Sequence, residues 1–343
     1  MQRNTIGLDV AKNIFHVVVF DHHGNQRLRK QLRRKQVTDW FAQQPESLVA
    51  MESCAGSHYW ARRLMALGHE VNLVAPQHVK AFLRGQKNDY NDAAAIAEAA
   101  GCAQMRFVPI KSAAQLDLQA IQRMRTRLIH ERTGLSNQLR GLLGEHGIVM
   151  AKSLTILRRR LPELLEDADN GLSALFRRLL SHGWRRLLRA DDEIRELDRE
   201  LNRAVQQDDN CQLLMSIPGY GPVVASCFSV VIGDGDCFSR GRDVSASLGL
   251  VPRQHTTGGK PKLLGISKRG SKELRTLLVQ GAQSVLRSAK GKDEPLCRWA
   301  LKVSARHGSN KAAVALANKL ARIGWAVVQS QTPYQPAYRL QNI

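Results

Sequence analysis

The sequence has no apolar run of the roughly 18–20 residues that a membrane-spanning helix needs, so we expect no membrane association. Its first residues, MQRNTIGLDV, enter a strand-like pattern almost at once and show no signal-peptide layout, which predicts a cytoplasmic protein. The six cysteines include no CxxC pair, and the eleven histidines show no metal-ligand spacing, so a zinc site or disulfide framework is disfavoured. Aromatic residues make up only 5%, and neither an aromatic platform for single strands nor a helix-turn-helix is evident.

Acidic residues are scarce relative to basic ones. Lysine and arginine total 51 against 30 aspartates and glutamates, which gives a formal net charge of +21 at pH 7 and a pI near 10.3. This excess favours polyanionic partners, with nucleic acid first and an anionic membrane surface second. Hydrophobic residues are 43% of the 343 residues, enough for packed cores in two or three domains.

The first stretch, residues 1–110, alternates strand-like and helix-like segments. Strand patterns in TIGLDV, IFHVVVFD and QRLRKQLRR come first, with DHHGN as a turn. Helix, strand, helix, strand and helix patterns follow, so the order is βββ-α-β-α-β-α. We therefore predict an α/β domain in which the first and fourth strands are neighbours at the centre of the sheet.

The second stretch, residues 111–207, carries two long helical patterns with apolar residues every three or four positions and a break near Pro162. Helices of this length suit an antiparallel hairpin or a coiled coil between subunits. A plain helical bundle with solvated charged faces is the alternative.

The third stretch, residues 208–343, is predicted to be mostly helical around two glycine-rich segments. The first, IPGYGPVVA at 217–225, fits a helix-hairpin-helix in which Gly219 and Gly221 let the turn approach a phosphate. The alternative is an ordinary connection between helices.

The second glycine-rich segment, HTTGGKPKLLGISKRG at 255–270, is predicted to be a flexible basic loop. Its cations can line a track for a nucleic-acid backbone, although a solvated surface loop explains the composition equally well. The candidate backbone contacts are Arg253, Lys260, Lys262, Lys268 and Arg269.

Two acids, Asp89 and Asp92, lie three residues apart at the start of an alanine-rich helical pattern, and Lys87 lies two residues before the first of them. Residues at this spacing share a helix face. A structural role is possible, with Asp89 or Asn88 as the helix N-cap. The same position suits a site where the acids face a substrate and Lys87 contacts its backbone.

Two further acids favour a functional site over a capping role. Asp9 ends the first predicted strand and Glu52 ends the fourth, and these strands are expected to be neighbours. The last helix of the domain brings Asp89 and Asp92 to the same edge. Four carboxylates gathered in a basic protein suit a hard divalent cation, most simply Mg²⁺, and a pair of such ions can clamp a reacting phosphodiester.

Six segments in order, GLDVAKN, MES, KNDYND, SIPGYGPVVA, GLVPRQHTTGGK and GISKRG, resemble the DEDD-type transposases of the one-ten family of insertion sequences, closest to its eleven-eleven branch. The resemblance covers nearly the whole chain. It implies a RuvC-like (ribonuclease H fold) domain over 1–110, a coiled-coil oligomerisation region over 111–207 and a transposase domain over 208–343. It also implies donor and target DNA, an element-encoded bridge RNA that selects them, a dimer of dimers, and a place at the bacterial nucleoid.

The resemblance assigns the metal-binding tetrad to Asp9, Glu52, Asp89 and Asp92, and it implies a covalent hydroxyl nucleophile in the last domain. The family's serine is replaced here within HTTGG, and Thr257 is the best match. Threonine is more hindered because its Cβ is branched. Thr256 and Ser267 stay open as alternatives, as does a poorly active copy.

Three functions are compatible with these residues. The first is an RNA-guided recombinase with a covalent protein–DNA intermediate. The second is a metal-dependent nuclease of the junction-resolving kind, in which water attacks. The third is a non-enzymatic nucleic-acid scaffold.

Overall fold

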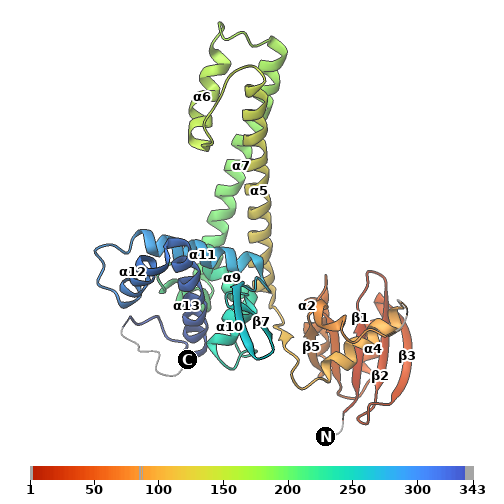
Figure 1. The fold of residues 1–343 in the computed structure, drawn as a ribbon. Helices are drawn as coiled ribbons and strands as arrows, with labels where there is room; N and C mark the ends of the chain where they lie inside the picture. The colour runs from red at the N-terminus through yellow and green to blue at the C-terminus, as the bar shows by residue number, and fades with distance from the viewer. Residues whose placement is uncertain (1–2, 85, 87, 337–343) are drawn as a thin grey trace.

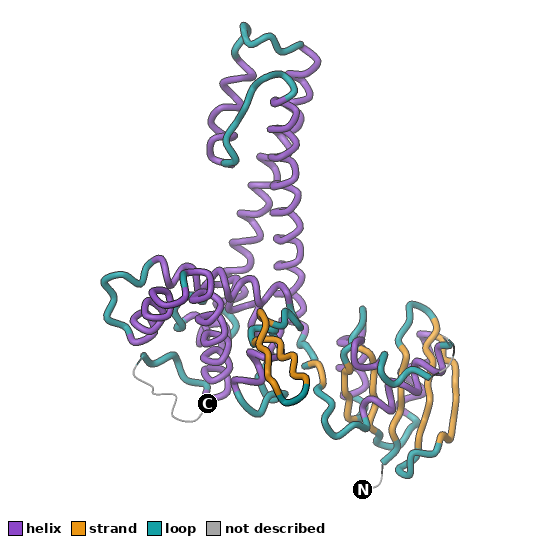
Figure 2. The backbone as a smooth tube through the Cα atoms, in the orientation of Figure 1, coloured by secondary structure: helices purple, strands orange, loops and turns teal. Residues whose placement is uncertain are grey.

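The computed structural model describes residues 3–84, 86 and 88–336. Figure 1 shows a mixed α/β domain at the amino-terminal end, a long stalk of paired helices, and a helical carboxyl-terminal region at the foot of the stalk. Figure 2 shows that the strands gather in the amino-terminal domain and in one hairpin of the carboxyl-terminal region. No helix in the described part of the chain is both long and apolar enough to cross a membrane.

The amino-terminal domain holds a six-stranded sheet in the order β3-β2-β1-β4-β5-β6. Its first and fourth strands are parallel neighbours, as predicted, and a short final strand, which the sequence did not suggest, pairs with β5. The strands are β1 (Thr5–Asp9), β2 (Ile14–Phe20), β3 (Gln26–Arg33), β4 (Leu48–Glu52), β5 (Glu70–Val74) and β6 (Phe107–Val108). The helices are η1 (Arg34–Gln36), α1 (Val37–Ala42), α2 (Ser57–Met65), α3 (Pro76–Val79) and α4 (Asp89–Ala100).

The two faces of this sheet have different partners. On one face Leu8 and Met51 are fully buried in a core that includes Trp60 and Leu64 of α2. On the other face the alanine-rich helix α4 packs on Ala50 and Val74. Alternation along a strand therefore assigns every second residue of β1 and β4 to the α4 face.

Gly7 sets how closely α4 approaches the sheet. A Cβ atom on Gly7 would lie 1.9 Å from the Ala93 carbonyl oxygen and 3.0 Å from the Ala97 Cβ. No side chain fits there, so the glycine lets the helix backbone rest directly on β1.

The stalk is an antiparallel pair, α5 (Ala113–Gly144) and α7 (Ala174–Gln206), with α6 (Leu154–Glu166) beside its far end. Arg125 pairs with Asp198, while further along α5 Arg132 pairs with Asp191, so the two helices run in opposite directions. Asp191 is buried and also binds the guanidinium of Arg158 from α6 through two nitrogens. These pairs hold the helices together within one chain.

The predicted break near Pro162 is wrong. Pro162 lies inside α6, and the chain leaves helical structure on either side, between α5 and α6 and between α6 and α7. Gly147 and Gly171 take positive φ angles in those connections. Proline costs a helix one backbone hydrogen bond, yet α6 runs through Pro162 to Glu166, where Asp167 caps it in an extended conformation.

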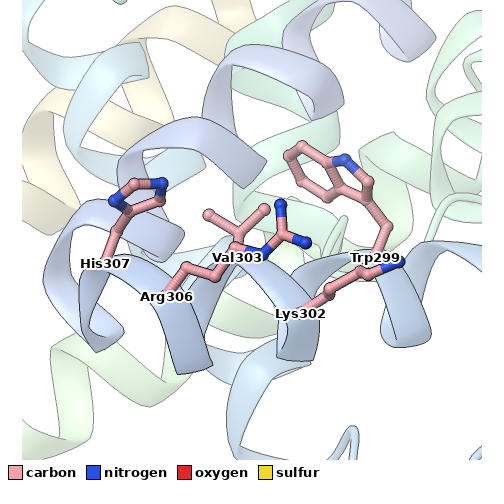
Figure 3. A pocket seen from close by; sticks show the side chains of 5 residues that line it. All are labelled: Trp299, Lys302, Val303, Arg306 and His307. Carbon is pink, nitrogen blue, oxygen red and sulfur yellow. The ribbon is translucent and has the colours of Figure 1, made fainter.

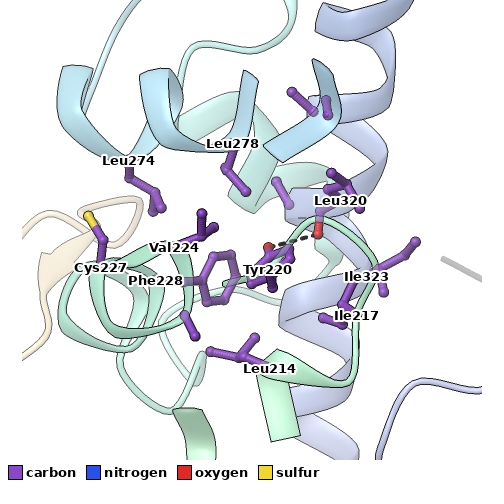
Figure 4. Close-up of a cluster of buried hydrophobic side chains, with 14 of the residues drawn as sticks. Leu214, Ile217, Tyr220, Val224, Cys227, Phe228, Leu274, Leu278, Leu320 and Ile323 are labelled. Atoms are coloured by element: carbon purple, nitrogen blue, oxygen red, sulfur yellow. Dashed lines mark hydrogen bonds between the residues drawn. The ribbon is translucent and has the colours of Figure 1, made fainter. Parts of the chain in front are cut away.

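The carboxyl-terminal region is mostly helical, as predicted. Tyr220 and Phe228 lie at the centre of its core, where the Tyr220 hydroxyl donates a 3.0 Å hydrogen bond to the Leu320 carbonyl (Figure 4). Its helices are α8 (Asp209–Met215), α9 (Pro222–Ile232), α10 (Gly241–Ser247), α11 (Lys272–Arg287), α12 (Pro295–His307) and α13 (Ser309–Ser330).

The predicted flexible loop at 255–270 is wrong over most of its length. Strands β7 (Pro252–Thr257) and β8 (Lys260–Ile266) form an antiparallel hairpin in which Thr257 pairs with Lys260. Gly258 and Gly259 form its two-residue turn with φ angles of 58° and 73°. Two consecutive positive φ angles match the right-handed twist of paired strands, so the glycine pair closes a hairpin there.

Candidate active site

The four predicted acids lie on one face of the amino-terminal sheet, at one edge. Asp9 ends β1 and Glu52 ends the neighbouring parallel strand β4. Leu8 and Met51 pair across these strands on the opposite face, so the acids that follow them point toward α4. Asp89 and Asp92 occupy the first turn of α4.

Electrostatics connect these four side chains. Burial, followed by repulsion from Asp92 and Asp89, raises the pKa of Asp9 from 3.8 to about 6. Glu52 adds to the rise and His16 opposes it. A carboxyl whose pKa is raised by three other acids lies in a region of concentrated negative charge, which is unusual in a chain of net charge +21.

The start of α4 leaves both of its acids available. Asn88 is the N-cap, and its side-chain oxygen accepts a 2.9 Å hydrogen bond from the Tyr90 backbone N–H. Asp89 is therefore not the cap, and its side chain is 58% exposed. The capping role that the sequence left open belongs to Asn88.

The donor set suits magnesium by its chemistry. All four groups are carboxylates, the oxygen ligands that Mg²⁺ prefers, and their mutual repulsion is what a cation would relieve. In the described residues, no three acid, histidine or cysteine side chains are arranged to hold a metal as they stand. The structure thus gathers negative charge that a divalent cation would balance.

His16 is a site residue that the sequence did not single out. It lies on β2 directly opposite Asp9 in the ladder, so both side chains are on the same face. Its Nδ1 is 3.5 Å from an Asp89 carboxylate oxygen, too long for a good hydrogen bond, and its ring packs edge-on against Tyr90 at 4.8 Å. The available signal was a polar residue inside the apolar run IFHVVVF.

Two arginines of β3 also belong to this face. Arg29 pairs with Val18 and Arg33 with Ile14, on either side of the pair between Gln31 and His16. Opposed residues share a face, so β3 presents two exposed guanidinium groups beside the acids. Lys30 points to the opposite face, over the Trp40 ring.

The predicted nucleophile lies on the exposed β7–β8 hairpin. Thr257 ends β7 beside the glycine turn, and the neighbouring Thr256 hydroxyl accepts a 2.8 Å hydrogen bond from the Gln254 amide. Ser267 follows β8, where its backbone N–H donates to the Val251 carbonyl. Among the described residues, no hydrogen bond or ion pair joins this hairpin to the acids.

The base of the hairpin is tightly built. A Cβ atom on Gly249 would lie 2.3 Å from the Arg269 backbone nitrogen, and one on Gly270 would lie 1.9 Å from the Ser247 oxygen. Arg275 donates to the Leu248 and Arg269 carbonyls at 2.9 and 2.8 Å. The exposed cations predicted here, on or beside the hairpin, are Arg253, Lys260, Lys262, Lys268 and Arg269.

The two glycines of the predicted helix-hairpin-helix have different surroundings. Gly219 has a φ of 88° and packs on α11, where a Cβ atom would lie 2.9 Å from the Gly281 carbonyl oxygen. Gly221 is exposed and caps α9. Gly219 thus has a packing role, while a phosphate contact at Gly221 stays a prediction. Lys87, the other predicted contact, lies outside the described residues.

Comparisons with known proteins identify the family. A DEDD transposase model of the IS110 type matches residues 6–148, and a model described as transposase, IS116/IS110/IS902 family, matches residues 211–314. A "Probable family 20 transposase" of Pseudomonas aeruginosa is 44% identical over 98% of this chain and 100% of its own length. The transposase for IS1111A of Coxiella burnetii is 41% identical over 96% of this chain and 91% of its own.

A more distant relative, the pilin gene-inverting protein of Moraxella lacunata, is 25% identical over 97% of this chain and 98% of its own length. The four acids, the hairpin and the turn at Gly219 all fall within the two matched regions. The chain belongs to the IS116/IS110/IS902 family of transposases.

Proposed function

We propose that this chain is a transposase that cuts and rejoins donor and target DNA, with Mg²⁺ held by Asp9, Glu52, Asp89 and Asp92. The observation that carries the proposal is the placement of four carboxylates, two at the ends of paired parallel strands and two in the first turn of the helix that packs on them. Bound magnesium would supply a Lewis acid for the reacting phosphate. Relatives named as transposases support the reaction class.

The proposed role of each residue follows from its position in the fold. Asp9 and Glu52 end paired strands and are fixed by the sheet, whereas Asp89 and Asp92 approach from α4. Arg29 and Arg33 hold the DNA backbone beside the acids through charge-assisted hydrogen bonds to phosphates.

Thr257 is the proposed nucleophile. Its hydroxyl oxygen attacks the phosphorus, the bond from phosphorus to the sugar oxygen breaks, and the DNA end stays attached as a threonyl phosphoester. The hydroxyl proton leaves to a base at the acid site, and the departing sugar oxygen takes up a proton in turn. Thr256 and Ser267 are the alternatives, and a water attack would make the protein a nuclease instead.

The site is proposed to form between subunits. In the described part of one chain the hairpin and the acids share no hydrogen bond or ion pair, which favours a hairpin from one subunit serving the acids of another. The α5–α7 stalk is the proposed contact between subunits, in a dimer of dimers.

Guidance by an element-encoded bridge RNA is the proposed source of sequence choice. The net charge of +21 suits a complex with RNA and two DNAs. The family membership supports the same assignment.

The test follows end-labelled DNA through cleavage with the full-length protein, the element's transcript and Mg²⁺. We expect a protein–DNA band that resists boiling in denaturant, is lost in Thr257→Ala, and persists in Thr256→Ala and Ser267→Ala. Thr257→Ser should form the band faster, because removing the Cβ branch opens the hydroxyl. A band that survives Thr257→Ala refutes the nucleophile assignment, and cleavage without any band makes water the attacking group.

A further inference from the structure

The last part of the chain, from Pro295 onward, has basic residues but no acidic residue of its own. After Glu294 the sequence contains no aspartate or glutamate. Two neighbouring helices in this region, α12 and α13, carry lysines and arginines along their lengths. Unbalanced positive charge on a folded surface favours an anionic ligand.

One face of α12 concentrates this charge around a hollow. Its volume is about 260 Å³. Figure 3 shows the side chains that line it, Trp299, Lys302, Val303, Arg306 and His307. Their spacing of three and four residues sets them on one side of the helix. Trp299 and Val303 provide apolar surface, while Lys302, Arg306 and His307 are exposed beside it.

The cations of this pocket lack acidic partners. In the described residues Lys302 and Arg306 have no hydrogen bond and no ion pair, although Arg298 on the same helix pairs with Asp293 at 3.3 Å. Lys319 of α13 lies 4.5 Å from the centre of the Trp299 ring. Burial, and then the charge of Arg322, lowers the pKa of Lys319, so an anion here would relieve an unfavourable charge.

We propose that the α12 pocket, lined by Trp299, Lys302, Val303, Arg306 and His307, binds the phosphodiester backbone of a nucleic acid. Lys302 and Arg306 are one helical turn apart, about 6 Å along the axis, and so can engage successive phosphates of one strand. The apolar surface of Trp299 and Val303 takes the sugar or base between them. In Figure 1, α12 lies on the side of the carboxyl-terminal region away from the amino-terminal domain and from β7.

A nucleic acid fits these observations better than an acidic protein. The pocket is small, so it can hold one nucleotide unit but not the surface of a folded protein. The cations form a row along a helix, and regularly repeated negative charge is a property of a polynucleotide strand. The transposase-family model covers residues 211–314 and so includes α12.

The experiment measures binding, independent of any cleavage, in a full-length Asp9→Asn background. Fluorescence anisotropy with labelled single-stranded RNA, single-stranded DNA and duplex DNA is recorded over a range of salt concentrations. The test variant is Lys302→Ala with Arg306→Ala. The matched control is Lys35→Ala with Arg63→Ala, which removes two exposed charges from η1 and α2.

We expect the test variant to raise Kd about tenfold and to lower the slope of log K against log salt by about 2, one for each lost phosphate contact. A loss with RNA alone, DNA alone or both supports the pocket and identifies which backbone it holds. Equal shifts in the test and control variants overturn the proposal. So does a polyglutamate peptide that competes as well as an oligonucleotide of equal charge.

Both side chains are exposed, so the fold should survive their removal, and a thermal melt checks this. If the alanine pair melts earlier than the control, Lys302→Gln with Arg306→Gln replaces it. Glutamine keeps much of the aliphatic stem and removes the charge.

Discussion

The two parts of the proposed site are built in opposite ways. The acids at the edge of the amino-terminal sheet are held by parallel strands and by a helix that rests on Gly7. Thr257 lies at the tip of a two-stranded hairpin whose strands are exposed along nearly their whole length. The sheet supplies fixed charge, whereas the hairpin extends a hydroxyl from a rigid base, an arrangement suited to joining across subunits.

The largest expected effect is on strand cleavage, and it distinguishes the acids from the hairpin hydroxyl by their chemistry. Asp9→Ala should lower strand cleavage about 1,000-fold or more, because losing metal-based charge stabilisation costs several kcal/mol at the transition state. Thr257→Ala should abolish cleavage and the covalent attachment together, because the same hydroxyl breaks the bond and holds the DNA end, but it should leave Mg²⁺ binding intact by calorimetry. The exposed acid Asp39 on α1 gives the control, since Asp39→Ala should cleave normally. Normal cleavage by Asp9→Ala would remove the acids from the mechanism.

The next largest effect compares two glycines. Gly7→Ala should lower the free energy of unfolding by about 2–4 kcal/mol, because the new methyl group collides with the α4 backbone. Gly258→Ala has open space around it and only left-handed strain, so it should cost about 1 kcal/mol. Chemical denaturation measures both. Equal losses would mean that α4 can move aside without cost, and the acids would then not be fixed by the sheet.

The sequence predicted that Asp9 and Glu52 lie at the same edge of the sheet, because strand order and strand ends suffice to locate them. Asp9 and Glu52 end neighbouring strands, and that neighbourhood follows from the βββ-α-β-α-β-α order. Arg29, Arg33 and His16 were missed because their face depends on antiparallel register, which alternation alone does not determine. Gly7 was missed for a similar reason, since its role depends on the distance to a helix 86 residues further on.

Predictions failed where local residue preferences competed. Pro162 favoured a break, yet α6 continues through it to Glu166, where Asp167 caps it in an extended conformation. The stretch around Gly258 and Gly259 was taken for a loop on composition, although two glycines between extended segments are also a hairpin signal. At the hairpin, the positions of the two glycines carried more information than the overall composition did.

A smaller effect tests whether the sheet edge, and not the general positive charge, holds DNA. Arg29→Ala with Arg33→Ala should weaken duplex binding about tenfold and lower the salt slope by about 2. Lys30→Ala lies between them in sequence but on the opposite face, over Trp40, so it should change binding by less than twofold. Binding isotherms at several salt concentrations measure this. Equal effects from Lys30 and from its neighbours would mean that β3 contributes only diffuse charge.

The smallest expected effect is on stability, which the repulsion among the four acids lowers as the pH rises. Because the pKa of Asp9 is about 6 in the folded protein against an ordinary 3.8, the folded state binds the proton more tightly. Stability without metal should therefore fall as pH rises from about 4 through 6, and the loss should be complete above that range. Asp9→Asn should remove this slope and stabilise the metal-free protein at pH 8 by roughly 1 kcal/mol, less than the full shift implies because Asp9 is partly exposed.

Magnesium should reverse the order of stability of wild type and Asp9→Asn at pH 8. At pH 8 the ion binds the deprotonated carboxylates of the wild-type folded state and raises its melting temperature, while Asp9→Asn gains less. Thermal melts at pH 4, 6 and 8, with and without Mg²⁺, measure both effects. Parallel pH profiles for wild type and Asp9→Asn would show that the acids do not repel one another in the folded protein. The four acids would then differ no more from ordinary surface charges than the cations of the hairpin do.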